Sequence, residues 1–356
     1  MELALLLPML AVAAASADTQ PPVYADKMNL MVYADEQGQL HPVTNLAEWQ
    51  RRRAHIVAAM EQVMGPLPNR PAPAVLNMTI EEEVDCGSFV RKRITFPVED
   101  WDRLPAYLLL PKNPEGKVAG VLCLHPTSPF GKKMVVGLGD KPNRNYAEEL
   151  AARGYVTLAP DYAGFGDYVD ARQALYERGY ISATMKGIWN HMRCVDLLQG
   201  LPEVDPNRIG CIGHSLGGHN TLFVGVFDQR IKVMVTSCGF NLFAKYKGGD
   251  LTGWSHDGYM PRIAEVYDVD PSKMPFDFTE VLGALAPRPV FVNAPLNDAN
   301  FEVSGVRDCI QAAHPVYALY GADADLVAAY PDAEHDFPME VRAQAYAFMD
   351  RVLGME

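Results

Sequence analysis

One serine framed by small residues is the clearest candidate for chemistry in this chain. Segment 213–217 reads Gly-His-Ser-Leu-Gly and lies between a short apolar run, 208–212, and a run compatible with a helix, 220–227. This is the pattern G-x-S-x-G between a strand and a helix. A serine on so sharp a turn has a strained backbone, and crowding there leaves room only for glycine two positions to either side. We therefore predict that Ser215 is a nucleophile.

A serine hydroxyl becomes a good nucleophile only beside a base, which a third group must orient. In sites of this type the acid and then the histidine follow the serine along the chain. Asp298 lies just after a buried strand-like run, 289–294, and His335 lies in a loop before the last helical stretch. The expected base is therefore His335, held in place by Asp298.

Other histidines and carboxylates compete for these two roles. The rival bases are His125, His191, His214, His219, His256 and His314. His125 ends a strand, and His214 and His219 lie around the sharp turn at Ser215, which we call the elbow; all three precede the acid. His191 and His314 fall in helices, and His256 falls in an insert. Packing or pocket lining suits them better, and we expect His214 to contact substrate. The rival acids Asp332, Glu334 and Asp336 are too close to the base along the chain, and Asp323 and Asp325 fall in a surface-like turn.

Hydrolysis of an ester or amide also needs two N–H groups that stabilise the oxyanion. The N–H of Leu216, directly after the serine, is the first candidate. The second should follow the apolar run 118–125, where Pro126 has no N–H to give. We therefore expect Thr127 as the second donor, with Ser128 as the alternative. Tyr162 offers either a hydroxyl to the oxyanion or a buried ring in a turn.

Composition and charge limit the classes of partner. The chain has 356 residues and a net charge of -13, which disfavours a nucleic-acid binder because little positive charge is concentrated to neutralise phosphates. The basic cluster 51–53 is typical of a solvated helix face. The six cysteines, found mainly in apolar runs, are expected to be free thiols rather than disulfides. No signal in the sequence indicates an oligomeric state.

The start of the chain is typical of a secretory signal peptide. An apolar run from Leu3 ends in the small residues Ala15-Ser16-Ala17, which predicts a cleaved segment 1–17 and a periplasmic or secreted protein. Because no Lys or Arg precedes the run, a cytoplasmic protein with a wrongly assigned start stays open. No other stretch approaches about 18 continuous apolar residues, so stable membrane insertion is not expected.

The remaining pattern predicts an N-terminal region, 18–77, with one helix at 45–64 and a Pro-rich linker, packed on a catalytic domain, 78–356. Early strands at 78–84, 89–96 and 106–110 give way to alternating strands and helices. The strands are expected at 118–125, 155–159, the elbow run, 231–236, 289–294 and 316–320, and the helices at 146–153, 181–199, 220–227, 278–285, 303–313 and 340–353. Such alternation is typical of an α/β protein with a mainly parallel sheet and helices on both faces. Sites in such sheets lie at the carboxyl ends of the strands, where Ser215 falls.

With these residues placed, the chain resembles the α/β-hydrolase superfamily, and most closely its dienelactone-hydrolase-like and acetyl-xylan-esterase-like branches of exported bacterial enzymes. The resemblance covers residues 85–355 and rests on segments 204–210, 213–218, 294–298 and 335–337. It implies a serine esterase with a Ser-His-Asp triad and no metal or organic cofactor. Dienelactone hydrolases use a cysteine where this chain has Ser215. Lipases of the His-Gly-Gly-Gly type have glycines where this chain has Pro126-Thr127-Ser128. Neither the substrate of dienelactone hydrolases nor that of lipases is therefore expected.

An insert at 239–280 interrupts the alternation and should lie over the strand ends. It brings Trp254 and Tyr259 together with polar side chains, which suits stacking on a sugar ring, although a packing role without ligand contact stays open. We therefore expect hydrolysis of short acyl esters, including acetyl groups on polysaccharide. The alternatives are a serine peptidase or lactone hydrolase of the same superfamily, and a binding protein that has lost activity.

Overall fold

The computed structural model describes residues 21–68 and 76–355. The predicted signal peptide lies outside these residues. Among the residues that are described, none of the helices combines the length and apolar character needed to cross a membrane. All six cysteines are free, as predicted.

Nine strands form one sheet in the order β11-β10-β9-β8-β6-β7-β5-β4-β3, and a separate hairpin joins β1 to β2. Pairing is parallel from β11 to β7 and antiparallel from β7 to β3, which confirms the mainly parallel α/β sheet. The strands are β1 (Val32–Ala34), β2 (Leu40–Pro42), β3 (Thr79–Asp85), β4 (Phe89–Glu99), β5 (Asp102–Pro111), β6 (Val118–Leu124), β7 (Val156–Pro160), β8 (Val204–His214), β9 (Ile231–Ser237), β10 (Val290–Asn293) and β11 (Leu326–Ala329).

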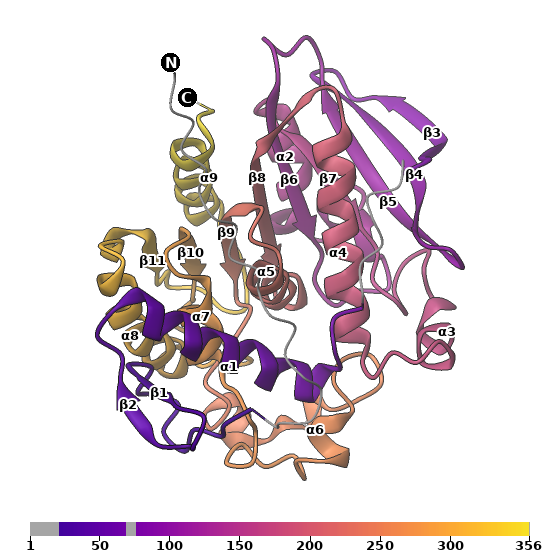
Figure 1. The fold of residues 1–356 in the computed structure, drawn as a ribbon. Coiled ribbons are helices and arrows are strands. Elements are labelled where there is room, and N and C mark those ends of the chain that lie inside the picture. Colours follow the sequence, from indigo (N-terminus) through magenta and orange to yellow (C-terminus); the bar gives the residue numbers. More distant parts are fainter. Residues whose placement is uncertain (1–20, 69–75, 356) are drawn as a thin grey trace, which may run out of the picture.

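Helices cover both faces of the sheet (Figure 1). Buried residues of α2 and α9 share one apolar cluster, and those of α1, α4, α5, α7 and α8 share the other. The helices are α1 (Leu46–Met64), α2 (Tyr146–Ala152), α3 (Ala171–Glu177), α4 (Ala183–Gly200), α5 (Leu216–Phe227), α6 (Arg262–Glu265), α7 (Phe278–Leu285), α8 (Val303–Leu319) and α9 (Met339–Leu353). The central strand β6 is buried along its whole length, as a strand covered on both faces should be.

The predicted strand at 316–320 is wrong. Helix α8 continues through Pro315 to Leu319, and the last strand is β11. Val316 and Tyr317 are fully buried, and the Tyr317 hydroxyl donates to the carbonyl of Arg288 (3.0 Å). A short apolar run has no decisive period of its own, so its packing against the core decides in favour of helix.

The basic cluster 51–53 is not a solvated face either. Arg52 is 1% exposed and pairs with Glu280 of α7 at 2.5 Å. Arg53 donates to the carbonyls of Ala284 and Val226, at the C-terminal ends of α7 and α5. Only Arg51 is exposed. The cluster therefore fastens α1 to the helices beneath it, because a guanidinium satisfies free carbonyls at helix ends.

Candidate active site

The elbow at Ser215 has the strain that its sequence predicts. Ser215 joins β8 to α5 with φ 54° and ψ -120°, a conformation that is rare for a residue with a side chain. A Cβ on Gly217 would lie 1.9 Å from the carbonyl oxygen of Leu124, and one on Gly213 would lie 2.2 Å from the backbone of Gly217. Both glycines are therefore required by close backbone approach, as expected.

The structure brings Asp298 and His335 into direct contact. Nδ1 of His335 lies 2.9 Å and 3.1 Å from the two carboxylate oxygens of Asp298. The Asp298 side chain is 1% exposed, whereas that of His335 is 31% exposed. Burial alone would raise the pKa of Asp298, but hydrogen bonds from His335 and from the N–H groups of Phe301 and Asn300 hold it below its ordinary value. This carboxylate is therefore ionised and orients the ring.

Ser215, His214 and His335 line one open pocket of about 300 Å³, together with residues of the loop that follows β6. The other ring nitrogen of His335 is free of hydrogen bonds within the described part of the chain, and no bond joins it to Ser215. Such contacts often tighten only when substrate binds. The geometry thus puts a strained serine and an oriented imidazole at one opening.

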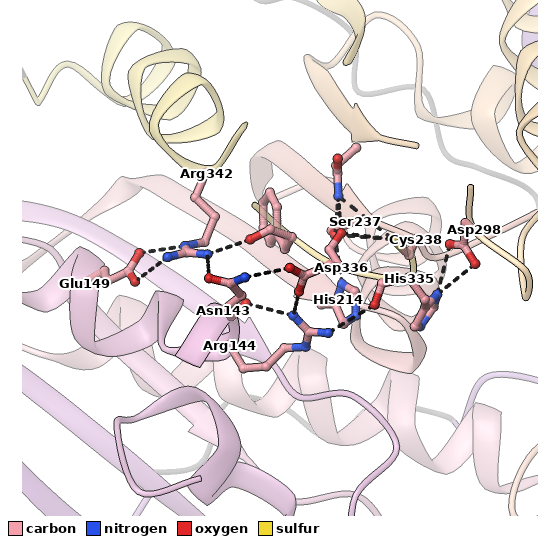
Figure 2. Close-up of polar contacts among 12 residues, drawn as sticks. Asn143, Arg144, Glu149, His214, Ser237, Cys238, Asp298, His335, Asp336 and Arg342 are labelled. Carbon is pink, nitrogen blue, oxygen red and sulfur yellow. Dashed lines mark hydrogen bonds and ion pairs between the residues drawn. The ribbon is translucent and has the colours of Figure 1, made fainter. Parts of the chain in front are cut away.

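Side chains from two other parts of the chain hold the loop that carries His335 (Figure 2). The Arg144 guanidinium bonds Asp336 (2.5 Å) and the carbonyl of His335 (3.2 Å). The Asn293 amide donates to the carbonyl of Asp336 (2.9 Å) and to the hydroxyl of Ser237 (2.8 Å). Sequence reasoning missed Arg144 and Asn293, because they come from separate parts of the chain and no motif marks them.

Burial separates His335 from the rival histidines His125, His214 and His219. It lowers the pKa of His125 to about 4 and that of His219 to about 3. It also lowers the pKa of His214 well below its ordinary value. Nδ1 of His214 shares a hydrogen bond with Ser237 (2.8 Å), and its ring packs 4.9 Å from that of His335. These histidines are neutral and enclosed, so they suit packing and pocket lining.

The predicted oxyanion donors flank the elbow. Leu216 opens α5, and Thr127 lines the pocket with Ser215. The Tyr162 hydroxyl donates to the carbonyl of His125 (2.9 Å), and its ring stacks on that histidine with centroids 3.8 Å apart. The buried ring in a turn therefore describes Tyr162 better than an oxyanion donor, and its contact fixes the start of the Thr127 loop.

The insert reaches the site through aromatic side chains. The Tyr259 hydroxyl lies 2.9 Å from Oγ1 of Thr127. The Trp254 ring is 5% exposed and packs 4.5 Å from that of His219 and 5.9 Å from that of Phe301. Trp254 is thus a buried wall in this structure, whereas Tyr259 is half-buried beside the pocket.

Three possible metal ligands lie together. The ligand atoms of Cys238, Asp298 and His335 are within 4.8 Å of one another. Burial, followed by the nearby charge of Asp298, raises the pKa of the Cys238 thiol well above its usual value. Because a metal is bound by the thiolate, this cysteine is a poor ligand at neutral pH, and the set fits a proton-relay pair better than a metal centre.

The sheet with its strained elbow and the acid–histidine pair defines an α/β-hydrolase. The family model described as glucuronyl esterase of fungi matches residues 169–321. The putative hydrolase YtaP of Bacillus subtilis is 28% identical over 304 residues, which are 82% of this chain and 97% of that protein. The 4-O-methyl-glucuronoyl methylesterase of Phanerochaete carnosa is 22% identical, and the match covers 88% of this chain and 79% of that protein.

Two solved structures have the same fold. The glucuronoyl esterase from Solibacter usitatus superposes with a TM-score of 0.69 at 21% identity, and the match covers 94% of this chain and 98% of the other. A putative acetyl xylan esterase from Bacteroides fragilis superposes with a TM-score of 0.62 at 19% identity, over 85% of each chain. These two likenesses show that the chain has the α/β-hydrolase fold.

Proposed function

We propose that this protein is a serine esterase that removes short acyl groups, acetyl above all, from carbohydrate. Ser215 is the nucleophile, His335 the base and Asp298 the group that orients it. One arrangement carries this proposal. The strained Ser215 of the β8–α5 turn lines the same pocket as the His335 imidazole, and Nδ1 of that imidazole is hydrogen-bonded to the buried Asp298 carboxylate. A relative named as a carbohydrate esterase and a solved structure named as a putative acetyl xylan esterase support the carbohydrate substrate.

The proposed reaction proceeds in two halves. Nε2 of His335 takes the proton of Ser215 as Oγ attacks the ester carbonyl, and the N–H groups of Leu216 and Thr127 stabilise the oxyanion. The imidazolium formed is stabilised by the Asp298 carboxylate, and it returns the proton to the leaving alcohol. A water then attacks the acyl-enzyme by the same route, releasing the acid and restoring the serine.

A second substrate class has support from the comparisons. The matching family model and a solved structure are named for glucuronoyl esterases, whose acyl group is a sugar acid. In that case the sugar would belong to the acyl half of the ester and the alcohol would be variable.

The peptidase and lactone hydrolase alternatives have no specific observation in their favour. The leader predicted at residues 1–17 would place the enzyme outside the cytoplasm, where polysaccharide is found.

Initial rates on nitrophenyl esters from acetate to octanoate test the esterase, with Ser215→Ala as the inactive variant. We expect hydrolysis by the wild type that is lost by about 10³-fold or more in Ser215→Ala. Acetylated xylan and a methyl ester of glucuronic acid then separate the two substrate classes. Full ester hydrolysis by a folded Ser215→Ala protein would refute the proposal.

A further inference from the structure

Two cavities are each lined by one residue of the proposed oxyanion hole. The larger one, of about 300 Å³, is lined by Ser215, Thr127 and His335. The smaller one, of about 20 Å³, is lined by Leu216 and Tyr259, together with side chains of α4 and of the turn after β7. The two residues that carry the proposed oxyanion donors thus line different cavities, so the oxyanion position lies between them.

One hydrogen bond joins a lining residue of the small cavity to a lining residue of the large one. The Tyr259 hydroxyl, on the side of the small cavity, lies 2.9 Å from Oγ1 of Thr127, on the side of the large one. This hydrogen bond is exposed to solvent, whereas the half-buried phenol ring of Tyr259 forms one wall of the small cavity.

The wall is held rigidly by its surroundings. The Tyr259 N–H donates to the carbonyl of His256 (2.9 Å), and its own carbonyl accepts from the N–H of Thr184 in the first turn of α4 (3.2 Å). Its ring packs edge-on against the ring of His256, with centroids 4.4 Å apart. The position of Tyr259 is therefore set by the central helix layer and not by the insert alone.

The chemistry assigns one half of the ester to each cavity. His335 returns a proton to the leaving alcohol, so the alcohol must lie in the large cavity beside that ring. With the carbonyl oxygen between Leu216 and Thr127, the acyl substituent is left with the small cavity behind Leu216. A space of about 20 Å³ holds roughly one water molecule, which is close to the size of a methyl group.

We infer that the small cavity is the acyl pocket and that Tyr259 is the residue that restricts it to acetyl esters. This inference rests on the proposed serine esterase and adds to it the determinant of acyl length. The ring of Tyr259 limits the length of the acyl group by its size, whereas the Tyr259 hydroxyl only holds the Thr127 loop.

The test compares Tyr259→Ala and Tyr259→Leu with Tyr259→Phe, which keeps the ring. The measured quantity is the ratio of kcat/KM for nitrophenyl hexanoate to that for nitrophenyl acetate. We expect this ratio to rise by about 10-fold or more in Tyr259→Ala and Tyr259→Leu, since even one methylene in a fitted pocket changes rates by that factor. The ratio should stay at the wild-type value in Tyr259→Phe, although rates on both esters fall together.

Tyr267→Ala is the matched control, because Tyr267 is a half-buried tyrosine of the same insert that lines neither cavity. Its ratio should equal that of the wild type. A ratio that is unchanged in both folded Tyr259→Ala and Tyr259→Leu would overturn the inference, as would a wild type that prefers long acyl chains. Both results would leave Ser215 as the nucleophile, because that assignment is tested separately by Ser215→Ala. A preference for long acyl chains would in addition contradict the short acyl group of the proposed substrate.

Discussion

Single residues decide the proton chemistry proposed for this protein. Nine histidines are present in the sequence, and the one that is bound to a buried carboxylate and opens onto the serine pocket is His335. Chain order was enough to select this histidine and Asp298 as candidates. It was not enough to select Arg144, because the contact between Arg144 and the His335 loop exists only after folding joins distant segments.

Replacing Asp298 by Asn should lower kcat by about 10³- to 10⁴-fold, because the amide no longer holds the correct tautomer or stabilises the imidazolium. Steady-state rates on nitrophenyl acetate measure this loss. Asp336→Asn is the matched control, since Asp336 bonds Arg144 and Asn143 and not the imidazole. A larger loss in Asp336→Asn than in Asp298→Asn would show that the wrong acid has been assigned.

At the scale of elements, the elbow is the part of the fold that the sequence specifies most fully. Glycine spacing around Ser215 predicted both the turn and the crowding that the structure shows. The segment 316–320 was less predictable, because alternating and helical patterns coincide over five residues and only the buried contacts of Tyr317 distinguish them.

Gly217→Ala should destabilise the fold by about 1–3 kcal/mol or more, because the new methyl group would meet the backbone of β6. Urea unfolding followed by circular dichroism measures the change. Gly187→Ala in α4 is the control: its Cβ would meet nothing nearer than 3.8 Å, and the helix gains up to about 1 kcal/mol. Equal stability of the two variants would contradict the crowding argument.

Arg52→Met should destabilise the protein by about 3–5 kcal/mol, because it leaves the buried carboxylate of Glu280 without its partner. Arg51→Met, one residue away on the exposed side of α1, should change stability by less than about 0.5 kcal/mol. The midpoints of urea unfolding compare the two. Similar midpoints would mean that α1 is not fastened through this ion pair.

For the whole molecule, the sequence predicted the layers and the position of the site at the strand ends. It could not predict how the insert meets the loop after β6, because the contact of Tyr259 with Thr127 depends on two irregular segments without a period. The division into an N-terminal region and a catalytic domain stays a prediction, although α1 packs against α7 and α4.

Acid should destabilise the molecule partly through its site. The pKa of Asp298 is lower in the folded protein than its ordinary value of 3.8, so its carboxylate stabilises the fold above that pH, and this contribution is lost as pH falls through the lowered value. Unfolding midpoints measured between pH 7 and pH 2.5 should therefore fall less steeply below pH 4 in Asp298→Asn than in the wild type. Parallel curves would contradict the lowered pKa.

The most direct test of the central claim is labelling by a fluorophosphonate, followed by mass spectrometry of the intact protein and its peptides. The account predicts one adduct per chain, located on Ser215, and no adduct in Ser215→Ala. It also predicts labelling that is slower by orders of magnitude in His335→Ala, because the serine then lacks its base. A folded wild type that takes no label, or that carries the label on another residue, would contradict the assignment of Ser215 as the nucleophile.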